Sequence, residues 1–189
     1  MPLILRHGYR HLFMRLTGKD SGWTLKARNF REIKGMSYTR RKYMRGIPGS
    51  KIVKFTMGNP TGEFDCAVEL VNLRDGQIRN NAFEAARIAA NRLLELKLGL
   101  ENYRLKIIPF PHHVLREHKR LNVAQADRFQ EGMKKAYGKP VGTAARVRRG
   151  MPIIVAEVPE RSVEVAKEAL KRAADKLPLP SRIMVKRNN

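Results

Sequence analysis

The chain has 189 residues, of which 39 are Lys or Arg and 17 are Asp or Glu, so its formal net charge is +22. The length suffices for one domain with a core, and the charge is far beyond what solubility needs, which favours a nucleic-acid partner over a membrane surface. The single cysteine, Cys66, excludes an internal disulfide framework and a multi-cysteine zinc site. The apolar start is too short for a secretory signal or a membrane span, so we expect a cytosolic protein.

The first 50 residues are predicted to form a basic arm, because they show neither a helical nor an alternating apolar period. The densest part of the arm begins at Tyr38 and interleaves tyrosines with arginines and lysines, a mix that suits phosphate contacts and stacking on bases or ribose. A disordered, solvated tail is the alternative interpretation. The turn sequence Ile47-Pro48-Gly49 and the aromatic residues argue against it.

Two strands and a helix are predicted next. Residues 51–57 alternate apolar and polar side chains, and residues 63–73 form a more buried apolar run in which Cys66 is expected to be an inert thiol. A helix is expected over residues 82–98 and closes at Gly99. We expect Asn80 and Asn81 to cap this helix, and its core stripe to consist of Ala82, Ala86, Ala89, Leu93 and Leu96, with Ile88 beside them.

The remaining elements complete a second strand, helix, strand series. Strands are predicted over residues 103–110, prolonged by 114–117 beyond Pro111, and over 143–150, 151–158 and 182–186, the middle pair flanking a turn at Gly150. An amphipathic helix opens near Ser162 and buries Val165, Ala169, Leu170 and Ala173 before Pro178 and Pro180 end it. The predicted fold class is α+β: one domain over residues 51–189, with a mostly antiparallel sheet covered by two helices.

The stretch from Arg116 to Gly150 is basic and rich in glycine, and we expect it to project from the domain and meet a polyanion. If residues 143–149 form a strand, Arg146 and Arg148 share one face and can grip successive phosphates, while Arg149 faces away or lies in the turn. Lys139 belongs to a rigid, charged corner before that strand.

Catalytic and metal sites are not predicted. His112 and His113 are adjacent on a strand and point to opposite faces, so they do not readily share a metal. The sequence GMKKAYGKP from Gly132 has the wrong glycine spacing for a phosphate-binding P-loop and carries Pro140 where Ser or Thr should follow the lysine. We therefore expect no catalytic residue, cofactor, metal or small-molecule substrate.

Five motifs together closely resemble the archaeal and eukaryotic large-subunit ribosomal protein family called ten-e, the counterpart of bacterial large-subunit protein sixteen. They are RRKYMRGIPGSKI from Arg40, NNAFEAARIAANR from Asn80, HHVLREHK from His112, ADRFQEGMKKAYGKPVGTAARVRRG from Ala126 and KEALKRAADKLP from Lys167. The resemblance covers roughly residues 27–186 in order and looks archaeal. Residues 1–26 have no recognisable counterpart, and no function is transferred to them.

The resemblance implies a non-enzymatic protein of an α/β-hammerhead type in the cytoplasmic ribosome. Its implied partners are large-subunit rRNA near the base of the central protuberance, A-site tRNA and neighbouring ribosomal proteins. We expect rRNA binding by Arg28, Arg31, Arg40, Arg41, Lys42, Tyr43, Arg45, Lys51, Lys139, Arg146, Arg148 and Arg149. The implied loop toward tRNA and the peptidyl transferase centre projects over residues 116–130 and includes Arg116, His118, Lys119, Arg120, Gln125, Asp127 and Arg128. Gln125 stands where family members usually carry glycine, which predicts a less flexible loop.

Two other functions are weighed against this one. A free architectural binder of nucleic acids would have the same charge, and duplex DNA bound as tightly as rRNA would favour it. An RNA-modifying enzyme is disfavoured, because no group of residues passes the geometric test for catalysis.

Overall fold

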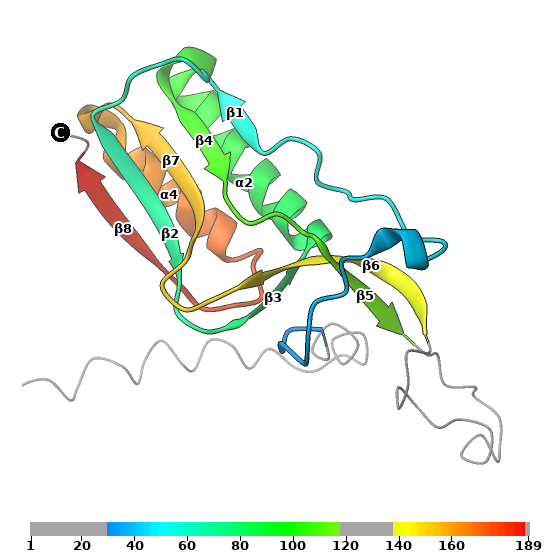
Figure 1. Ribbon diagram of the computed structural model, residues 1–189. Helices are drawn as coiled ribbons and strands as arrows, with labels where there is room; N and C mark the ends of the chain where they lie inside the picture. The colour runs from blue at the N-terminus through cyan, green and yellow to red at the C-terminus, as the bar shows by residue number, and fades with distance from the viewer. Residues whose placement is uncertain (1–29, 118–137, 188–189) are drawn as a thin grey trace, which may run out of the picture.

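The computed structural model describes residues 30–117 and 138–187. Within these ranges the chain forms, in order, β1 (Thr56–Gly58), β2 (Cys66–Asn72), β3 (Gly76–Arg79), α2 (Asn80–Leu98), β4 (Arg104–Ile107), β5 (His113–Glu117), β6 (Lys139–Val147), β7 (Pro152–Val158), α4 (Val163–Ala174) and β8 (Ser181–Arg187) (Figure 1). Short 3-10 helices occupy η2 (Arg41–Tyr43), η3 (Leu100–Asn102) and η4 (Glu160–Ser162).

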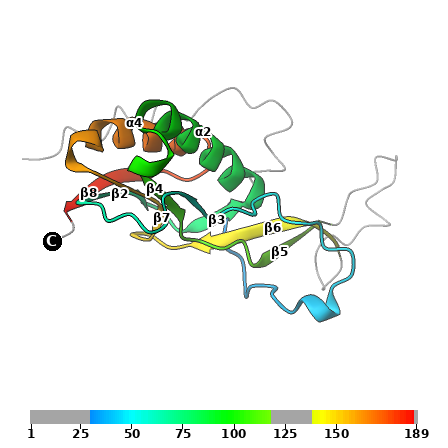
Figure 2. The same cartoon turned by 90° about the horizontal axis from the view of Figure 1, so that it is seen from above.

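Five strands form an antiparallel sheet in the order β1-β4-β7-β2-β8, and both helices lie on the same side of it (Figure 2). Alternation along β2 places Val68 and Leu70 in the core, fully buried. On the opposite face, Glu69 pairs with Lys186 of β8 at 2.9 Å. The predicted α+β class, with antiparallel strands and two covering helices, is confirmed.

Helix α2 is where the sequence predicts it, but its buried face differs from the predicted stripe. Ala86 and Leu93 are buried as expected, whereas Ile88 and Leu96 are 51% and 77% exposed. The helix instead buries Asn80, Phe83, Ala86, Ala90, Leu93 and Leu94. The reason is that α2 packs on α4 as well as on the sheet, which rotates the buried face toward Ala90 and Leu94.

The caps of α2 also differ in part from the prediction. Asn80 is the first helical residue and is buried, and the capping position is Arg79, which makes no side-chain cap hydrogen bond. At the other end the prediction is confirmed, because Gly99 closes the helix with φ of 78° and donates its N–H to the Glu95 carbonyl. Gly99 therefore occupies a conformation that disfavours other residues.

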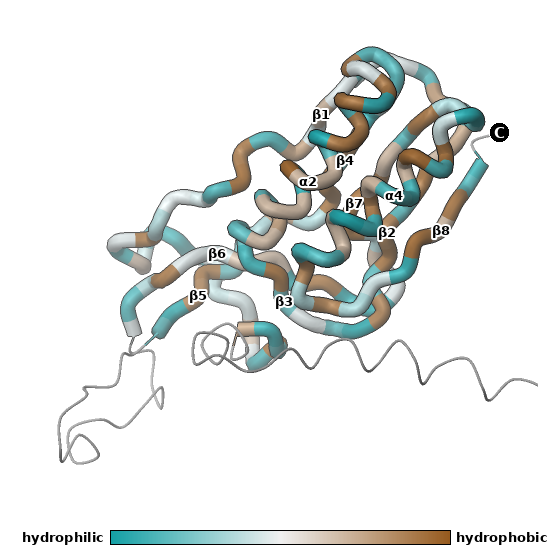
Figure 3. The backbone as a smooth tube through the Cα atoms, turned by 180° about the vertical axis from the view of Figure 1, so that it is seen from behind, coloured by the Kyte–Doolittle hydropathy of each residue, from teal (hydrophilic) through white to brown (hydrophobic). Residues whose placement is uncertain are grey.

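The C-terminal helix and strand are close to their predicted places. Helix α4 begins at Val163, directly after Ser162, and buries Ala169, Leu170 and Ala173 as expected; Ala166 is the fourth buried residue, whereas Val165 is only half-buried. Strand β8 follows and pairs with β2 over its whole length. In Figure 3 the hydrophobic segments gather where the two helices meet β2 and β7, which is the core of the domain.

Two predicted strand boundaries are wrong. The strand expected over residues 51–57 pairs with β4 only from Thr56 to Gly58. Before Thr56, the Phe55 carbonyl accepts the N–H of Ile107 at 2.8 Å, but residues 51–54 are not part of the strand. Residues 114–117 do not prolong β4. The chain leaves the five-stranded sheet at Pro109 and Pro111, and residues 114–117 belong to β5, a strand of a second sheet.

The second sheet is antiparallel and has the order β3-β6-β5. Strand β3 was not predicted, and β6 begins at Lys139, earlier than expected. The expectation that the whole stretch to Gly150 projects from the domain is wrong for β6, where Thr143, Ala144, Ala145 and Val147 are buried. Strands β6 and β7 flank Gly150 as predicted, but they belong to different sheets and do not pair with each other.

Candidate nucleic-acid interface

The three-stranded sheet has one apolar and one polar face. Ile78, Ala145 and Val147 belong to the core on the side of α2. Gln77 lies directly opposite Arg146 in the strand register, so these two residues share the other face. Residues 30–46, which we call the crossing segment, run across this polar face and contact all three strands.

Strand β3 binds the start of the crossing segment through Gln77. The backbone N–H of Gln77 donates to the Arg31 carbonyl at 2.8 Å, and its side-chain amide donates to the carbonyls of Glu32 at 2.6 Å and Phe30 at 3.3 Å. The guanidinium of Arg79 lies 5.7 Å from the centre of the Phe30 ring. The backbone of the segment is thus fixed at its first described residues.

Strand β6 binds the middle of the crossing segment through Arg146. Its guanidinium donates to the carbonyls of Gly35 at 2.8 Å, Met36 at 3.0 Å and Lys34 at 3.4 Å. The five-donor fork of arginine suits such a set of backbone acceptors. Arg148 does not share the strand face with Arg146, because β6 ends at Val147 and Arg148 is exposed beyond it.

Strand β5 binds the segment where it reaches Tyr38. The N–H of Tyr38 donates to Nδ1 of His113 at 2.9 Å, and the N–H of Val114 donates to the Tyr38 carbonyl at 3.0 Å. The guanidinium of Arg116 lies 3.8 Å from the centre of the Tyr38 ring. Because Nδ1 accepts a hydrogen bond, His113 is neutral in this arrangement.

Burial lowers the pKa of His113 to about 4, and the nearby charges of Arg146, His112 and Arg116 act in the same direction. An unfolded histidine has a pKa of about 6.5. Between about pH 6.5 and pH 4, His113 is therefore protonated in the unfolded chain but neutral in the folded protein. The stability contributed by His113 is therefore complete above about pH 6.5 and is lost as the pH falls toward 4.

We predict that the His113→Asn variant loses less stability on acidification than the parent protein, because the Asn carbonyl can accept the Tyr38 N–H without titrating. Urea unfolding at neutral pH and near pH 4.5 measures both proteins. The parent should lose more than the variant by on the order of 1 to 2 kcal/mol. Equal losses in the two proteins would contradict a neutral, buried His113.

A hollow of about 860 Å³ lies beside the contact between Tyr38 and Arg116. Its described lining is Met36, Ser37, Tyr38, Thr39, Arg40, Tyr43, Met44, Arg45, Arg116, Gly138, Lys139 and Pro140. Four of these residues are basic and none is acidic. The ring of Tyr43 is 70% exposed and has the Lys42 ammonium 4.9 Å from its centre. An aromatic ring among cations can bind a base together with its phosphates.

The structure divides the predicted binding residues into groups. Arg40, Tyr43, Arg45, Lys139 and Arg116 meet at the hollow. Arg31, Arg41, Lys42 and Lys51 are exposed on or after the crossing segment, and Arg148 and Arg149 are exposed at the turn after β6. Arg28, His118, Lys119, Arg120, Gln125, Asp127 and Arg128 lie outside the described residues.

Three contributors to this surface were missed from the sequence. Gln77 lies in a short polar run with no strand pattern, so nothing local marks it. Met36 and Met44 carry no charge or ring, although both line the hollow. The interleaving of Tyr38 and Tyr43 with basic residues was the one signal that pointed to this place.

Other chemistry finds little support in the described ranges. There, no three His, Cys, Asp or Glu side chains are grouped so as to hold a metal ion, and no helix is long and apolar enough to cross a membrane. His112 is exposed while His113 is buried, so the two point apart as predicted. Cys66 is a buried free thiol, also as predicted.

Comparison with known proteins identifies the family of the chain. The family described as ribosomal protein L16p/L10e matches residues 33–184. The chain is similar to the large ribosomal subunit protein uL16 of Staphylothermus marinus, with 54% identity over 160 residues that cover 85% of this chain and 92% of that protein. It is also similar to the protein of the same name from Hyperthermus butylicus, with 51% identity over 158 residues that cover 84% and 88%. The chain thus belongs to the L16p/L10e family of ribosomal proteins.

Proposed function

We propose that this protein is a structural, non-enzymatic constituent of the large subunit of the cytoplasmic ribosome and that the hollow beside the crossing segment binds large-subunit rRNA. The observation that carries the proposal is the described lining of the hollow, which contains four basic side chains and two tyrosines but no acidic one. The names of the relatives, as large-subunit proteins, support the ribosomal setting. The resemblance supports a position near the base of the central protuberance.

The composition of the hollow favours an unstacked base over a regular duplex. The ring of Tyr43 offers a stacking face, and Arg40, Arg45 and Lys139 line the same hollow, where they can meet the flanking phosphates of one strand. A duplex presents only its backbone and its shallow groove, and so would leave the tyrosine unused. Exposed Arg148 and Arg149, at the turn after β6, would add separate phosphate contacts.

The same surface supports a role in aminoacyl-tRNA accommodation. Strand β5 ends at Glu117 and β6 begins at Lys139, and the described residues Arg116 and Lys139, on either side of the connecting segment, line the hollow. Arg116 and Lys139 would hold the root of this loop against rRNA. The loop residues that resemble the family, among them Asp127 and Arg128, would then extend toward the A-site tRNA and the peptidyl transferase centre.

We predict that Tyr43→Ala weakens binding to single-stranded RNA, since loss of one base-stacking ring costs about 1 to 3 kcal/mol. Fluorescence anisotropy of the full chain with labelled oligouridine and with a duplex RNA of equal length measures the effect. The affinity for oligouridine should fall by between roughly fivefold and 150-fold, while the affinity for the duplex changes little.

Tyr43→Phe is the matched control, because it keeps the ring and removes only the hydroxyl. It should bind oligouridine like the parent protein. Sucrose-gradient sedimentation of cell lysates at moderate and high salt then tests the ribosomal setting. A protein that stays at the top of the gradient would argue for a free nucleic-acid binder. An unchanged affinity in Tyr43→Ala would contradict base stacking on Tyr43 but not the ribosomal setting.

A further inference from the structure

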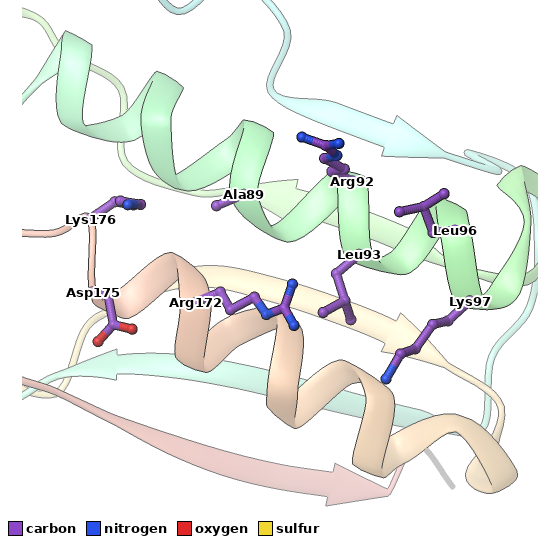
Figure 4. Close-up of a pocket in the computed structure, with 8 residues that line it drawn as sticks. All are labelled: Ala89, Arg92, Leu93, Leu96, Lys97, Arg172, Asp175 and Lys176. Atoms are coloured by element: carbon purple, nitrogen blue, oxygen red, sulfur yellow. The ribbon is translucent and has the colours of Figure 1, made fainter.

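A groove of about 360 Å³ lies at the surface of the helix layer, along the line where α2 packs on α4 (Figure 4). Its lining is Ala89, Arg92, Leu93, Leu96 and Lys97 from α2, with Arg172, Asp175 and Lys176 from α4 and the turn after it. Figure 2 shows the helix layer on one side of the five-stranded sheet and the crossing segment below the three-stranded sheet, so the groove and the hollow face different directions. The proposed RNA contacts do not use this groove.

The floor of the groove is apolar and includes a residue that the fold leaves uncovered. Leu93 is 4% exposed and packs into the core, whereas Leu96, one turn along α2, is 77% exposed. The sequence pattern assigns Leu96 to the core stripe, and Ile88 on the same helix is also exposed. Ile88 does not line the groove, so Leu96 is the groove residue that satisfies the pattern of a buried face but is left uncovered by the described part of the chain. Because Leu96 stands beside the apolar Leu93 and Ala89 in one groove, a partner side chain placed there would bury apolar surface.

The rim of the groove is predominantly basic. Arg92, Lys97, Arg172 and Lys176 line it together with one acid, Asp175. Glu168 accepts hydrogen bonds from both Lys97 and Arg172 at 2.8 Å, which neutralises part of that charge. Among the described residues, Arg92 and Lys176 contact no carboxylate, so two cations at the rim remain available to a ligand.

We infer that this groove binds a segment of another protein that presents one apolar side chain flanked by carboxylates. The apolar side chain would pack against Leu96, Leu93 and Ala89. The carboxylates would pair with Arg92 and Lys176 at the rim. An RNA backbone would use the cations but not the apolar floor. An uncharged apolar segment would use the floor but leave the cations unpaired, so a segment of both characters fits best.

Fluorescence anisotropy of the full chain with three labelled peptides tests the inference. The first peptide has a central leucine flanked by glutamates, the second replaces the leucine with serine, and the third replaces the glutamates with lysines. We expect the first to bind and the other two to bind at least tenfold more weakly. Unlabelled oligouridine, added as a competitor, should not displace the first peptide.

Two variants place the binding in the groove. Leu96→Gln keeps helix propensity at an exposed position and should weaken the first peptide about tenfold, and Arg92→Glu should weaken it threefold or more. Leu100→Gln and Arg182→Glu make the same changes at exposed positions outside the groove and should leave the affinity within twofold. The inference is overturned if no peptide binds, if the serine peptide binds equally well, if RNA displaces the peptide, or if the control variants lose as much as the groove variants.

Discussion

Replacing Arg146 with alanine is expected to detach the crossing segment from the three-stranded sheet and to weaken RNA binding on the order of tenfold or more. The guanidinium holds three consecutive carbonyls, those of Lys34, Gly35 and Met36, and so fixes the middle of the segment. Hydrogen bonds to a charged donor contribute about 1.5 to 3 kcal/mol each when buried, and less at a partly exposed site, so the loss of stability should be about 2 kcal/mol.

Three measurements follow the Arg146→Ala variant. Urea unfolding gives the loss of stability. Limited trypsin digestion followed by mass spectrometry should show faster cleavage at Arg31, Lys34 and Arg40, because a released segment fits a protease while a docked one does not. Anisotropy with oligouridine should show the weaker binding, since Tyr38 and Tyr43 lose their fixed positions at the hollow.

Arg148→Ala is the matched control for this prediction. It removes the same charge one position beyond β6, from an exposed side chain with no hydrogen bond to the described backbone. Its stability should stay within about 0.5 kcal/mol of the parent and its trypsin pattern should not change. If both variants lost RNA affinity while their stability and their trypsin cleavage pattern stayed unchanged, Arg146 would bind phosphate directly and would not hold the crossing segment in place.

Most of the main fold could be predicted from the sequence because its signals are local. The apolar run around Val68, the alanine-rich helix closed by Gly99 and the amphipathic helix after Ser162 each carry their period within one segment. The buried face of α2 could be predicted only in part. Which residues of α2 are covered depends on both the sheet and α4. The sequence of α2 alone does not show that α4 packs against it.

The docking of the crossing segment could not be predicted, because its determinants are far apart in the sequence. Gln77 and the carbonyl of Glu32 are separated by 45 positions, and Arg146 and the carbonyl of Gly35 by 111. In the sequence ARVRRG, Arg146 and Arg148 look equivalent. The end of β6 at Val147 and the register that places Arg146 opposite Gln77 distinguish them, and both are properties of the pairing between strands.

This docking changes what the basic composition means for binding. A disordered arm would lose conformational entropy on meeting RNA, whereas a segment that already contacts all three strands has lost it on folding. The hydrogen bonds of Gln77, Arg146 and His113 with the crossing segment offset that loss of entropy within the folded protein. Arg40, Tyr43 and Arg45 are then presented in a fixed arrangement. Stability measurements should therefore separate substitutions at the three anchors, which hold the segment, from substitutions at the exposed RNA ligands.

The Gly58→Ala variant is expected to lose about 3 kcal/mol or more of stability, by combining backbone strain with a clash. Gly58 has φ of 81°, and a Cβ atom there would lie 2.1 Å from the carbonyl oxygen of Tyr103. That oxygen already accepts the N–H of Asn59 at 2.9 Å. Tyr103 cannot move away readily, because its ring is fully buried and its hydroxyl donates to Asn91 of α2 at 2.8 Å.

Gly99→Ala separates the two causes, because Gly99 has φ of 78° but no atom of the described structure lies within 4 Å of the place that a Cβ would take there. This control should lose only the strain, about 1 to 2 kcal/mol, so urea unfolding should place Gly58→Ala below it by a further 2 kcal/mol or so. Equal losses would mean that β1 can shift away from Tyr103 at little cost. Because neither glycine touches the hollow, the folded fraction of both variants should bind oligouridine like the parent, in contrast to Arg146→Ala.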